Sequence, residues 1–273
     1  MINCCIANLN FTFCYVSKLM HHQLQKYITS EKGDIIISTE IVDNLDFPKE
    51  EAKYHSKYYD IYEINNEIIQ VQRFEDGSFI GIIIYRINSA TILLTKENLG
   101  QKEYVLSEYA FMYFILNKQD AILIHSSSFK YLDKGILLIA SSGVGKSTHA
   151  RLWKEHVGIE QINDDKNIII NENNTLYIYG NPWSGKYLID ENKKIKLTNF
   201  VFIHRSENNS VKNITKKEEF LLLIPHITNS SFMYSREKWN NMTNKLIEIN
   251  GCILNCNISY DAVDKLKEYL EVN

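Results

Sequence analysis

One segment limits the possible folds of this chain more than any other. An apolar run from Gly135 to Ala140 is followed directly by Ser-Ser-Gly-Val-Gly-Lys-Ser-Thr. It matches the phosphate-loop pattern G-x-x-x-x-G-K-[ST], except that Ala140 stands where the first glycine is expected. The apolar run predicts a buried strand, and the residues from Lys146 to about His156 predict a helix that ends at Gly158. A loop between a strand and a helix is the setting in which this motif binds phosphate.

Each residue type in this loop has a chemical role in binding phosphate. Small residues let backbone N–H groups turn inward around a phosphate, and the helix N-terminus adds positive charge. Lys146 supplies a cation for the β- and γ-phosphates, and the Ser147 hydroxyl is a ligand for Mg²⁺. We therefore predict a site for ATP or another nucleoside triphosphate with Mg²⁺; the alternative is a glycine-rich connector that binds nothing. The predicted nucleotide-binding residues are Ser141, Ser142, Gly143, Val144, Gly145, Lys146, Ser147 and Thr148.

Two adjacent aspartates, Asp164 and Asp165, follow a short predicted strand soon after that helix. In nucleotide-binding folds a carboxylate at a strand end reaches Mg²⁺, and a second one can accept a proton from an attacking hydroxyl. The same Asn-Asp-Asp sequence also favours a β-turn, which is the purely structural alternative. Upstream, His125 ends another buried strand. It reaches the same site if its strand neighbours the strand that enters the phosphate loop, and otherwise it is a core histidine.

The residues before about position 100 are rich in β-branched and aromatic side chains and predict a β-rich subdomain. Residues 104–117 predict a buried helix, so we place the boundary just before it and expect two parts, 1–100 and 101–273. The second part mixes short strands with helices, which makes the predicted fold class α/β (α+β). Its later elements are expected at 159–163, 167–171, 176–180, 187–190, 199–204, 216–223 and 252–256, with a final amphipathic helix after Ser259.

Composition excludes several classes of protein. The chain has 273 residues, 45% of them hydrophobic, which is enough for a core. A formal net charge of -3 gives no strong attraction to nucleic acid, and no apolar run approaches the ~18–20 residues of a membrane span. Five cysteines without a recognisable secretion signal predict reduced thiols and a cytoplasmic protein. Cys252 and Cys256 are interpreted as ordinary strand residues, with a metal site as the less favoured alternative.

His125-Ser-Ser, the phosphate loop and Asp164-Asp165, in this order, resemble the bacterial HPr kinase/phosphorylase family over residues 120–205. That family has a kinase core related to phosphoenolpyruvate carboxykinases, in which the phosphate loop is set in a β-rich α/β core. The resemblance implies a serine kinase in which Asp164 is the general base, assisted by His125. It also implies that Ser147 and Asp165 hold Mg²⁺ and that Lys146 binds the transferring phosphate.

One stretch departs from the family pattern. The bifunctional enzymes carry an acidic residue before a glycine-rich turn, whereas residues 179–186 contain none, so phosphorylase activity is not expected. The Pro-Trp-Ser-Gly sequence within this stretch is similar to the HPr-kinase-like branch instead. Lys186 is predicted to contact a phosphate, with a plain β-turn as the alternative. Arg205 is predicted to stabilise the transferring phosphoryl group, with an exposed structural arginine as the alternative.

Stand-alone relatives of this length resemble kinases that phosphorylate a serine of a ribosomal peptide precursor, such as a lasso peptide precursor. The predicted partners are therefore a nucleotide and a peptide or protein serine, with no nucleic acid and no membrane. Two alternatives remain: a small-molecule kinase or carboxykinase-like enzyme, and a non-catalytic nucleotide-dependent module whose β-rich part docks a peptide. The oligomeric state is left open, a homo-oligomer included.

Overall fold

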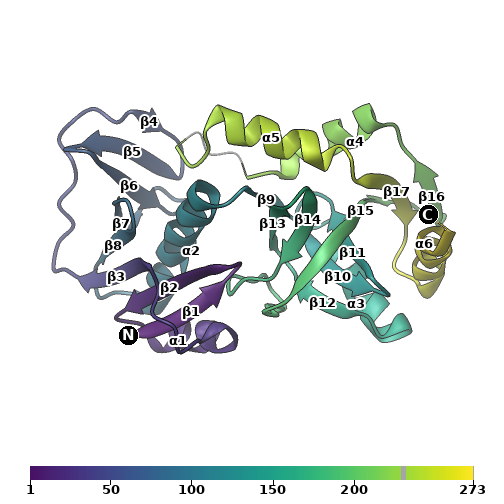
Figure 1. Ribbon diagram of the computed structural model, residues 1–273, viewed down its shortest axis with the longest axis horizontal. Helices are drawn as coiled ribbons and strands as arrows, with labels where there is room; N and C mark the ends of the chain where they lie inside the picture. The colour runs from purple at the N-terminus through teal and green to yellow at the C-terminus, as the bar shows by residue number, and fades with distance from the viewer. Residues whose placement is uncertain (229–231, 273) are drawn as a thin grey trace. The chain divides into compact units, whose positions relative to one another are not determined.

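The structure is a computed structural model that describes residues 1–228 and 232–272. The chain divides into two compact units, Met1–Lys118 and Gln119–Asn273 (Figure 1). The helix that we placed in the second part, α2 (Leu99–Lys118), belongs to the first unit. It packs on strands β7 and β8 of that unit, so its apolar side chains cover the sheet that comes before it in the chain. The division therefore falls after the helix instead of near residue 100.

The first unit is built on an eight-stranded sheet in the order β1-β2-β3-β8-β7-β6-β5-β4. Its strands are β1 (Ile2–Ile6), β2 (Leu9–Cys14), β3 (Ile35–Ile41), β4 (Tyr54–His55), β5 (Tyr59–Ile64), β6 (Glu67–Arg73), β7 (Phe79–Tyr85) and β8 (Ser89–Leu94). The hairpin of β1 and β2 was not predicted. Its turn is Ala7-Asn8, both with positive φ, and the asparagines nearby obscure the apolar alternation.

Helix α1 (Lys18–Leu24), the 3₁₀ turn η1 (Gln25–Tyr27) and α2 complete this unit. Glu103 of α2 is buried, and its carboxylate is satisfied from two other elements. It accepts a hydrogen bond from the backbone N–H of Ser17 at 2.9 Å and one from the hydroxyl of Thr39 at 3.3 Å. A buried charge with such partners fixes α2 against both α1 and β3.

The second unit holds a mixed sheet in the order β12-β10-β11-β15-β14-β13-β9, with β17 beside β15 and β16 beside β17. Its strands are β9 (Ala121–His125), β10 (Ser127–Tyr131), β11 (Lys134–Ile139), β12 (Glu160–Asn163), β13 (Lys166–Glu172), β14 (Thr175–Tyr179), β15 (Lys194–Arg205), β16 (Ser210–Asn213) and β17 (Asn250–Cys256). Strand β15 is twelve residues long: its start pairs antiparallel with β14, and the rest lies parallel between β11 and β17. The mixed α/β class predicted from the sequence is confirmed.

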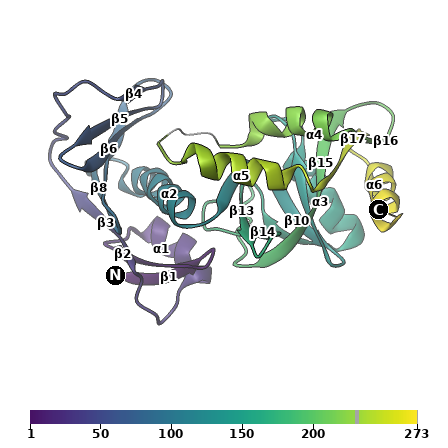
Figure 2. The same cartoon turned by 45° about the horizontal axis from the view of Figure 1, so that its top comes forward.

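Helices cover both faces of this sheet (Figures 1 and 2). They are α3 (Lys146–Val157), α4 (Lys216–Leu223), α5 (Arg236–Leu246) and α6 (Tyr260–Val272), with a 3₁₀ turn η2 (Ile224–His226) after α4. Helices α3 and α6 share one apolar core with the sheet, and α4 and α5 share the core on its other face. Helix α5 was not predicted. In the part of the chain that the structure describes, no helix is long and apolar enough to cross a membrane.

The packing of α6 gives a test of this layered arrangement. Leu266 of α6 is fully buried, whereas Leu221 of α4 is 62% exposed. We expect Leu266→Ala to lower the free energy of unfolding by about 2–5 kcal/mol, because it leaves a cavity in the core. The matched variant Leu221→Ala should change it by less than about 0.5 kcal/mol. All three tryptophans lie in the second unit, so urea unfolding followed by tryptophan fluorescence reports on it. Equal losses for the two variants would contradict the packing described.

Candidate functional site

The phosphate loop lies between β11 and α3, as predicted. Gly143 has φ +78° and Gly145 has φ +129°, backbone conformations that favour glycine. Gly145 is the N-cap of α3, and within the described chain no side chain makes a capping hydrogen bond there. The N–H groups of the first helical turn therefore remain available to an anion, which is the arrangement that binds phosphate in such loops.

Lys146 joins the start of α3 to the end of β11. The residue is only 6% exposed, and its Nζ donates to the carbonyl of Ala140 at 2.8 Å and lies 3.0 Å from Nε2 of His125. Burial lowers the pKa of Lys146, and the negative charge of Asp165 opposes that shift. The acceptor is the main-chain carbonyl of Ala140, so an alanine in place of the motif's first glycine does not prevent this bond.

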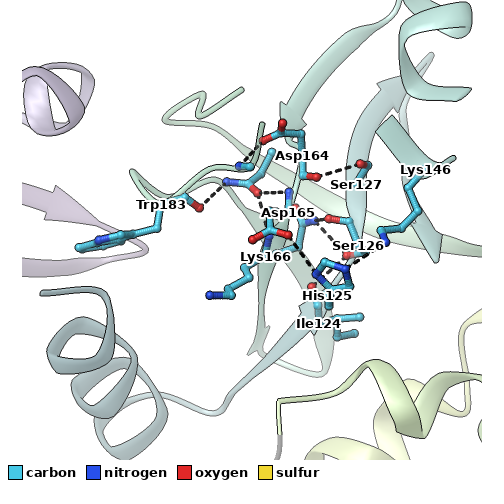
Figure 3. A network of polar contacts seen from close by, with 12 residues as sticks. Ile124, His125, Ser126, Ser127, Lys146, Asp164, Asp165, Lys166 and Trp183 are labelled. Atoms are coloured by element: carbon cyan, nitrogen blue, oxygen red, sulfur yellow. Dashed lines mark hydrogen bonds and ion pairs between the residues drawn. The ribbon is translucent and has the colours of Figure 1, made fainter. Parts of the chain in front are cut away.

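His125 connects Lys146 to Asp165, as Figure 3 shows. Its Nδ1 lies 3.1 Å from Oδ1 of Asp165, and its Nε2 faces Lys146. An ammonium group can only donate, so Nε2 is the acceptor and Nδ1 carries the hydrogen that points to Asp165. Strand β9 is not a neighbour of β11, the strand that enters the phosphate loop, so the condition set for His125 is not met. It pairs with β13 instead, with His125 opposite Lys166, and this pairing brings His125 next to Asp165.

Asp165 is held as a carboxylate. Burial by itself would raise its pKa, but the hydrogen bond from His125 and the positive charges of Lys166 and Lys146 outweigh burial, and the pKa is lowered. The side chain is 32% exposed, so its oxygens remain open to a ligand. This carboxylate can accept a proton or bind a cation.

Asp164 has a different environment. It is buried, its Oδ1 accepts the N–H of Gly185 at 2.6 Å, and its Oδ2 accepts the N–H of Tyr187 at 2.8 Å. A Cβ at position 185 would lie 3.0 Å from the Cβ of Asp165 and 3.2 Å from Oδ2 of Asp164, so glycine allows this close approach. The strand expected at 187–190 is wrong: the segment is a loop held by Asp164, with only a single bridge at Asp190.

Most of the predicted residues meet at one cavity of about 280 Å³. It is lined by the predicted residues His125, Ser142, Gly143, Gly145, Lys146, Ser147, Thr148, Asp164, Asp165 and Lys186, together with Gly185 and Tyr187. We call it the phosphate cavity. Ser141 and Val144 do not line it but face neighbouring cavities. The structure thus brings the loop, the histidine, both aspartates and Lys186 together.

Arg205 is not placed as predicted. It does not line the phosphate cavity; its Nε donates to the carbonyl of Val144 at 3.1 Å, and a second guanidinium nitrogen donates to the carbonyl of Gly143. Parallel pairing of β15 with β11 carries Arg205 to the outer side of the loop. Both carbonyls belong to the loop itself, so Arg205 braces its backbone instead of facing a transferring phosphoryl group.

Sequence reasoning missed a buried polar scaffold beneath the aspartates. Asn163 accepts the N–H groups of Asp165 at 2.9 Å and Lys166 at 3.0 Å, and its amide donates to the carbonyls of Asn181 and Trp183. These bonds are an Asx-type turn. The turn considered as an alternative for Asn-Asp-Asp is therefore present, and it is what holds the two aspartates in the site.

A second asparagine fastens the strand that carries His125. The amide of Asn167 donates to the carbonyl of Ser126 at 2.7 Å and to its hydroxyl at 2.9 Å, while its oxygen accepts from Ser128 at 2.5 Å. The hydroxyl of Ser127 donates to the carbonyl of Asp164 at 3.1 Å. The serines after His125 thus tie it to the segment that carries the aspartates.

The donor groups suit a hard cation bound together with phosphate. Among the described residues, no group of three or more His, Cys, Asp or Glu side chains could hold a metal alone. Ser147 and the aspartates line the same cavity as the loop, and Mg²⁺ is commonly held by one or two oxygen side chains plus substrate phosphates.

Cys252 and Cys256 are free and buried, and burial raises the pKa of each thiol.

Comparisons with known proteins give little beyond this geometry. No protein-family model matches the chain, and no curated protein matches its sequence. A solved structure of the Hpr(Ser) kinase/phosphatase from Coxiella burnetii is similar with a TM-score of 0.32 and 11% identity, covering 54% of this chain and 95% of that chain. At this level of likeness, conclusions about function depend on the site itself.

Asn163 tests whether the polar scaffold holds the site. We expect Asn163→Ala to lower the free energy of unfolding by about 1–3 kcal/mol, because it leaves buried backbone groups without their partners. The control Asn208→Ala changes an exposed asparagine in a loop and should leave stability within about 0.5 kcal/mol. Urea unfolding of both variants measures the difference. An Asn163→Ala protein as stable as the control variant would show that the scaffold is not needed.

The lowered pKa of Asp165 predicts how the free energy of unfolding changes with pH. Its pKa in the folded protein is below its ordinary value of 3.8, so its contacts stabilise the fold above that pH. Their contribution disappears as the pH falls below 3.8 through the folded-state pKa. We expect the loss of unfolding free energy between pH 7 and pH 3 to be smaller in Asp165→Asn than in the wild type. Denaturant titrations at the two pH values measure it, and an equal or larger acid loss in the variant would contradict the assigned contacts.

Proposed function

We propose that this protein is a kinase that uses ATP, or another nucleoside triphosphate, with Mg²⁺ to phosphorylate a serine hydroxyl. The observation that carries the proposal is the convergence of a phosphate loop, its lysine, a histidine and two aspartates on one cavity. Phosphoryl transfer needs cationic and N–H groups around the phosphates, and a proton acceptor for the attacking hydroxyl. The cavity supplies both kinds of group side by side.

The pair His125–Asp165 is the best candidate for the proton acceptor. Asp165 is the more exposed of the two aspartates, and His125 holds it by one hydrogen bond at 3.1 Å. Asp164, to which the family resemblance gives this role, already accepts an N–H group on each oxygen. In the proposed step the serine oxygen forms a bond to the γ-phosphorus, the bond to the β-phosphate oxygen breaks, and the serine proton goes to Asp165.

The other residues would bind and position the reactants. Lys146 and the N–H groups of the loop would hold the β- and γ-phosphates, and Lys186 lines the same cavity. Ser147, with Asp164 or Asp165, would hold Mg²⁺, which when bound supplies positive charge against the phosphates. Lys146 is released from Ala140 and His125 when it turns to a phosphate oxygen, so binding of the nucleotide also frees His125.

For the acceptor we propose a serine in a peptide or protein, with a ribosomal peptide precursor of the lasso type as the first candidate. This narrower proposal depends on the resemblance described above. A small-molecule acceptor would need further cationic groups in the cavity to hold a carboxylate. In the described part of the chain, the cavity offers only Lys146 and Lys186 as cations, which favours an uncharged hydroxyl.

Mass spectrometry of candidate precursor peptides from neighbouring genes, incubated with the protein, ATP and Mg²⁺, tests this function. We expect a gain of ~80 Da on a serine with the wild type. Lys146→Ala and Asp164→Asn should each lower the rate by at least about 100-fold. Lys196→Ala, on β15 and outside the cavity lining, is the matched lysine control and should retain activity. ATP binding without transfer to any peptide would move the proposal to a small-molecule acceptor, and no ATP binding would refute it.

The roles of the two aspartates are distinguished by how the activity of each variant depends on the Mg²⁺ concentration. If Asp165 accepts the proton, Asp165→Asn lowers the maximal rate by about 100-fold or more without raising the Mg²⁺ concentration needed for half-maximal activity. Asp164→Asn should then raise that concentration. Rates measured over a range of Mg²⁺ concentrations decide between the assignments, and the opposite result would return the proton-accepting role to Asp164.

A further inference from the structure

A cavity of about 460 Å³ borders the phosphate loop and has no role in the function proposed above. It lies within the second unit, and its lining residues come from the segments 139–144, 202–205 and 221–226. We call it the side cavity. Ser141 lines the side cavity and Ser142 lines the phosphate cavity, and consecutive Cα atoms are only ~3.8 Å apart. The two cavities are therefore neighbours at the start of the loop.

His226 places one wall of the side cavity next to the proposed proton acceptor. The residue after it, Ile227, forms an antiparallel bridge with Ile124, so the segment that carries His226 runs beside the end of β9. The last residue of β9 is His125. Burial lowers the pKa of His226, and the positive charges of Lys146 and His125 lower it further, which also places its ring near those groups. A chain that enters the side cavity therefore passes close to the reacting end of the phosphate cavity.

The walls of the side cavity combine apolar and basic side chains. Leu221 and Leu222 of α4 give it an apolar surface, and His204, Arg205 and His226 are basic. None of the described residues that line it is acidic. Leu221 is 62% exposed although it lines the cavity, so an apolar group that entered would remove part of this surface from water. These walls suit a ligand that is apolar in one part and negatively charged in another.

Arg205 supplies the permanent positive charge of the side cavity. Within the residues that the structure describes, its hydrogen bonds go to the neutral carbonyls of Gly143 and Val144. A guanidinium group has five N–H donors, so further donors remain after these two bonds. A carboxylate beside Arg205 would therefore form a charge-assisted hydrogen bond without breaking the contacts that brace the loop.

We propose that the side cavity binds the acceptor chain next to its serine and selects an apolar residue and a carboxylate at nearby positions. The inference rests on the proposed function and narrows it, because it assumes a peptide or protein acceptor. An extended chain spans ~3.3–3.6 Å per residue, so residues about two or three positions from a serine in the phosphate cavity reach the side cavity. The apolar residue would cover Leu221 and Leu222, and the carboxylate would pair with Arg205.

A panel of synthetic peptides tests this selection. Each peptide has a single serine in a glycine–alanine background, and carries near the serine either leucine and aspartate, leucine and lysine, or neither pair. With ATP and Mg²⁺, we expect kcat/KM for the leucine–aspartate peptide to exceed that for the other peptides by at least about tenfold, because only this peptide matches both walls. Initial rates of phosphopeptide formation, followed by mass spectrometry, measure the preference.

Leu221→Asp places a negative charge in the side cavity at an exposed position, where the fold tolerates it. It should lower kcat/KM for the leucine–aspartate peptide by about tenfold and raise that for the leucine–lysine peptide, while the KM for ATP stays unchanged. The matched control is Leu132→Asp, at a leucine that is 63% exposed in the turn between β10 and β11. That turn lies at the other end of β11 from the phosphate loop, so the control should show the wild-type preference.

The outcomes separate this inference from the proposed function. Equal kcat/KM values for all peptides in the wild type, or the same preference in Leu221→Asp as in Leu132→Asp, would overturn the acceptor site. A raised KM for ATP in Leu221→Asp with an unchanged peptide preference would assign the side cavity to the nucleotide and also overturn it. Transfer to none of the peptides by a protein that binds ATP would overturn it as well, whereas failure to bind ATP would refute the proposed function itself.

Discussion

The site depends on the position of the Lys146 ammonium group, held between the carbonyl of Ala140 and the ring of His125. A buried lysine is costly unless it has such partners. These two contacts connect β11, α3 and β9, and the further bond from His125 to Asp165 adds the segment before β13. Four segments between residues 121 and 165 are thus tied to one another through a single line of polar groups, and together with residues 185–187 they line the phosphate cavity.

The phosphate loop is held from both sides. Lys146 binds its first residue from within, and Arg205 binds the carbonyls of Gly143 and Val144 from the outer side. A loop with two glycines at positive φ has considerable conformational freedom, which these contacts restrict. Gly143, Gly145 and Thr148 line both the phosphate cavity and a neighbouring cavity of about 750 Å³, so the two cavities meet at this loop.

The two asparagines beneath the site act on the segments that carry His125 and the two aspartates. Asn163 shapes the turn that presents Asp164 and Asp165, and Asn167 fastens the serines that follow His125. Their amide groups supply donors and acceptors that backbone pairing alone leaves unsatisfied at the irregular end of β9 and β13. The site is therefore a consequence of how the strand ends are joined, and its geometry depends on side chains that do not line the phosphate cavity.

The sequence by itself determined the phosphate loop, helix α3 and the strand before it, because their signals are local: apolar run, small residues, lysine and helix end follow one another directly. It also placed His125 and Asp164–Asp165 at strand ends. Only the tertiary structure decided that α2 covers the first sheet, that Arg205 lies outside the phosphate cavity and that His149 lines a second one. These facts depend on strand order and on which helix packs on which face, and those are set by contacts between distant residues.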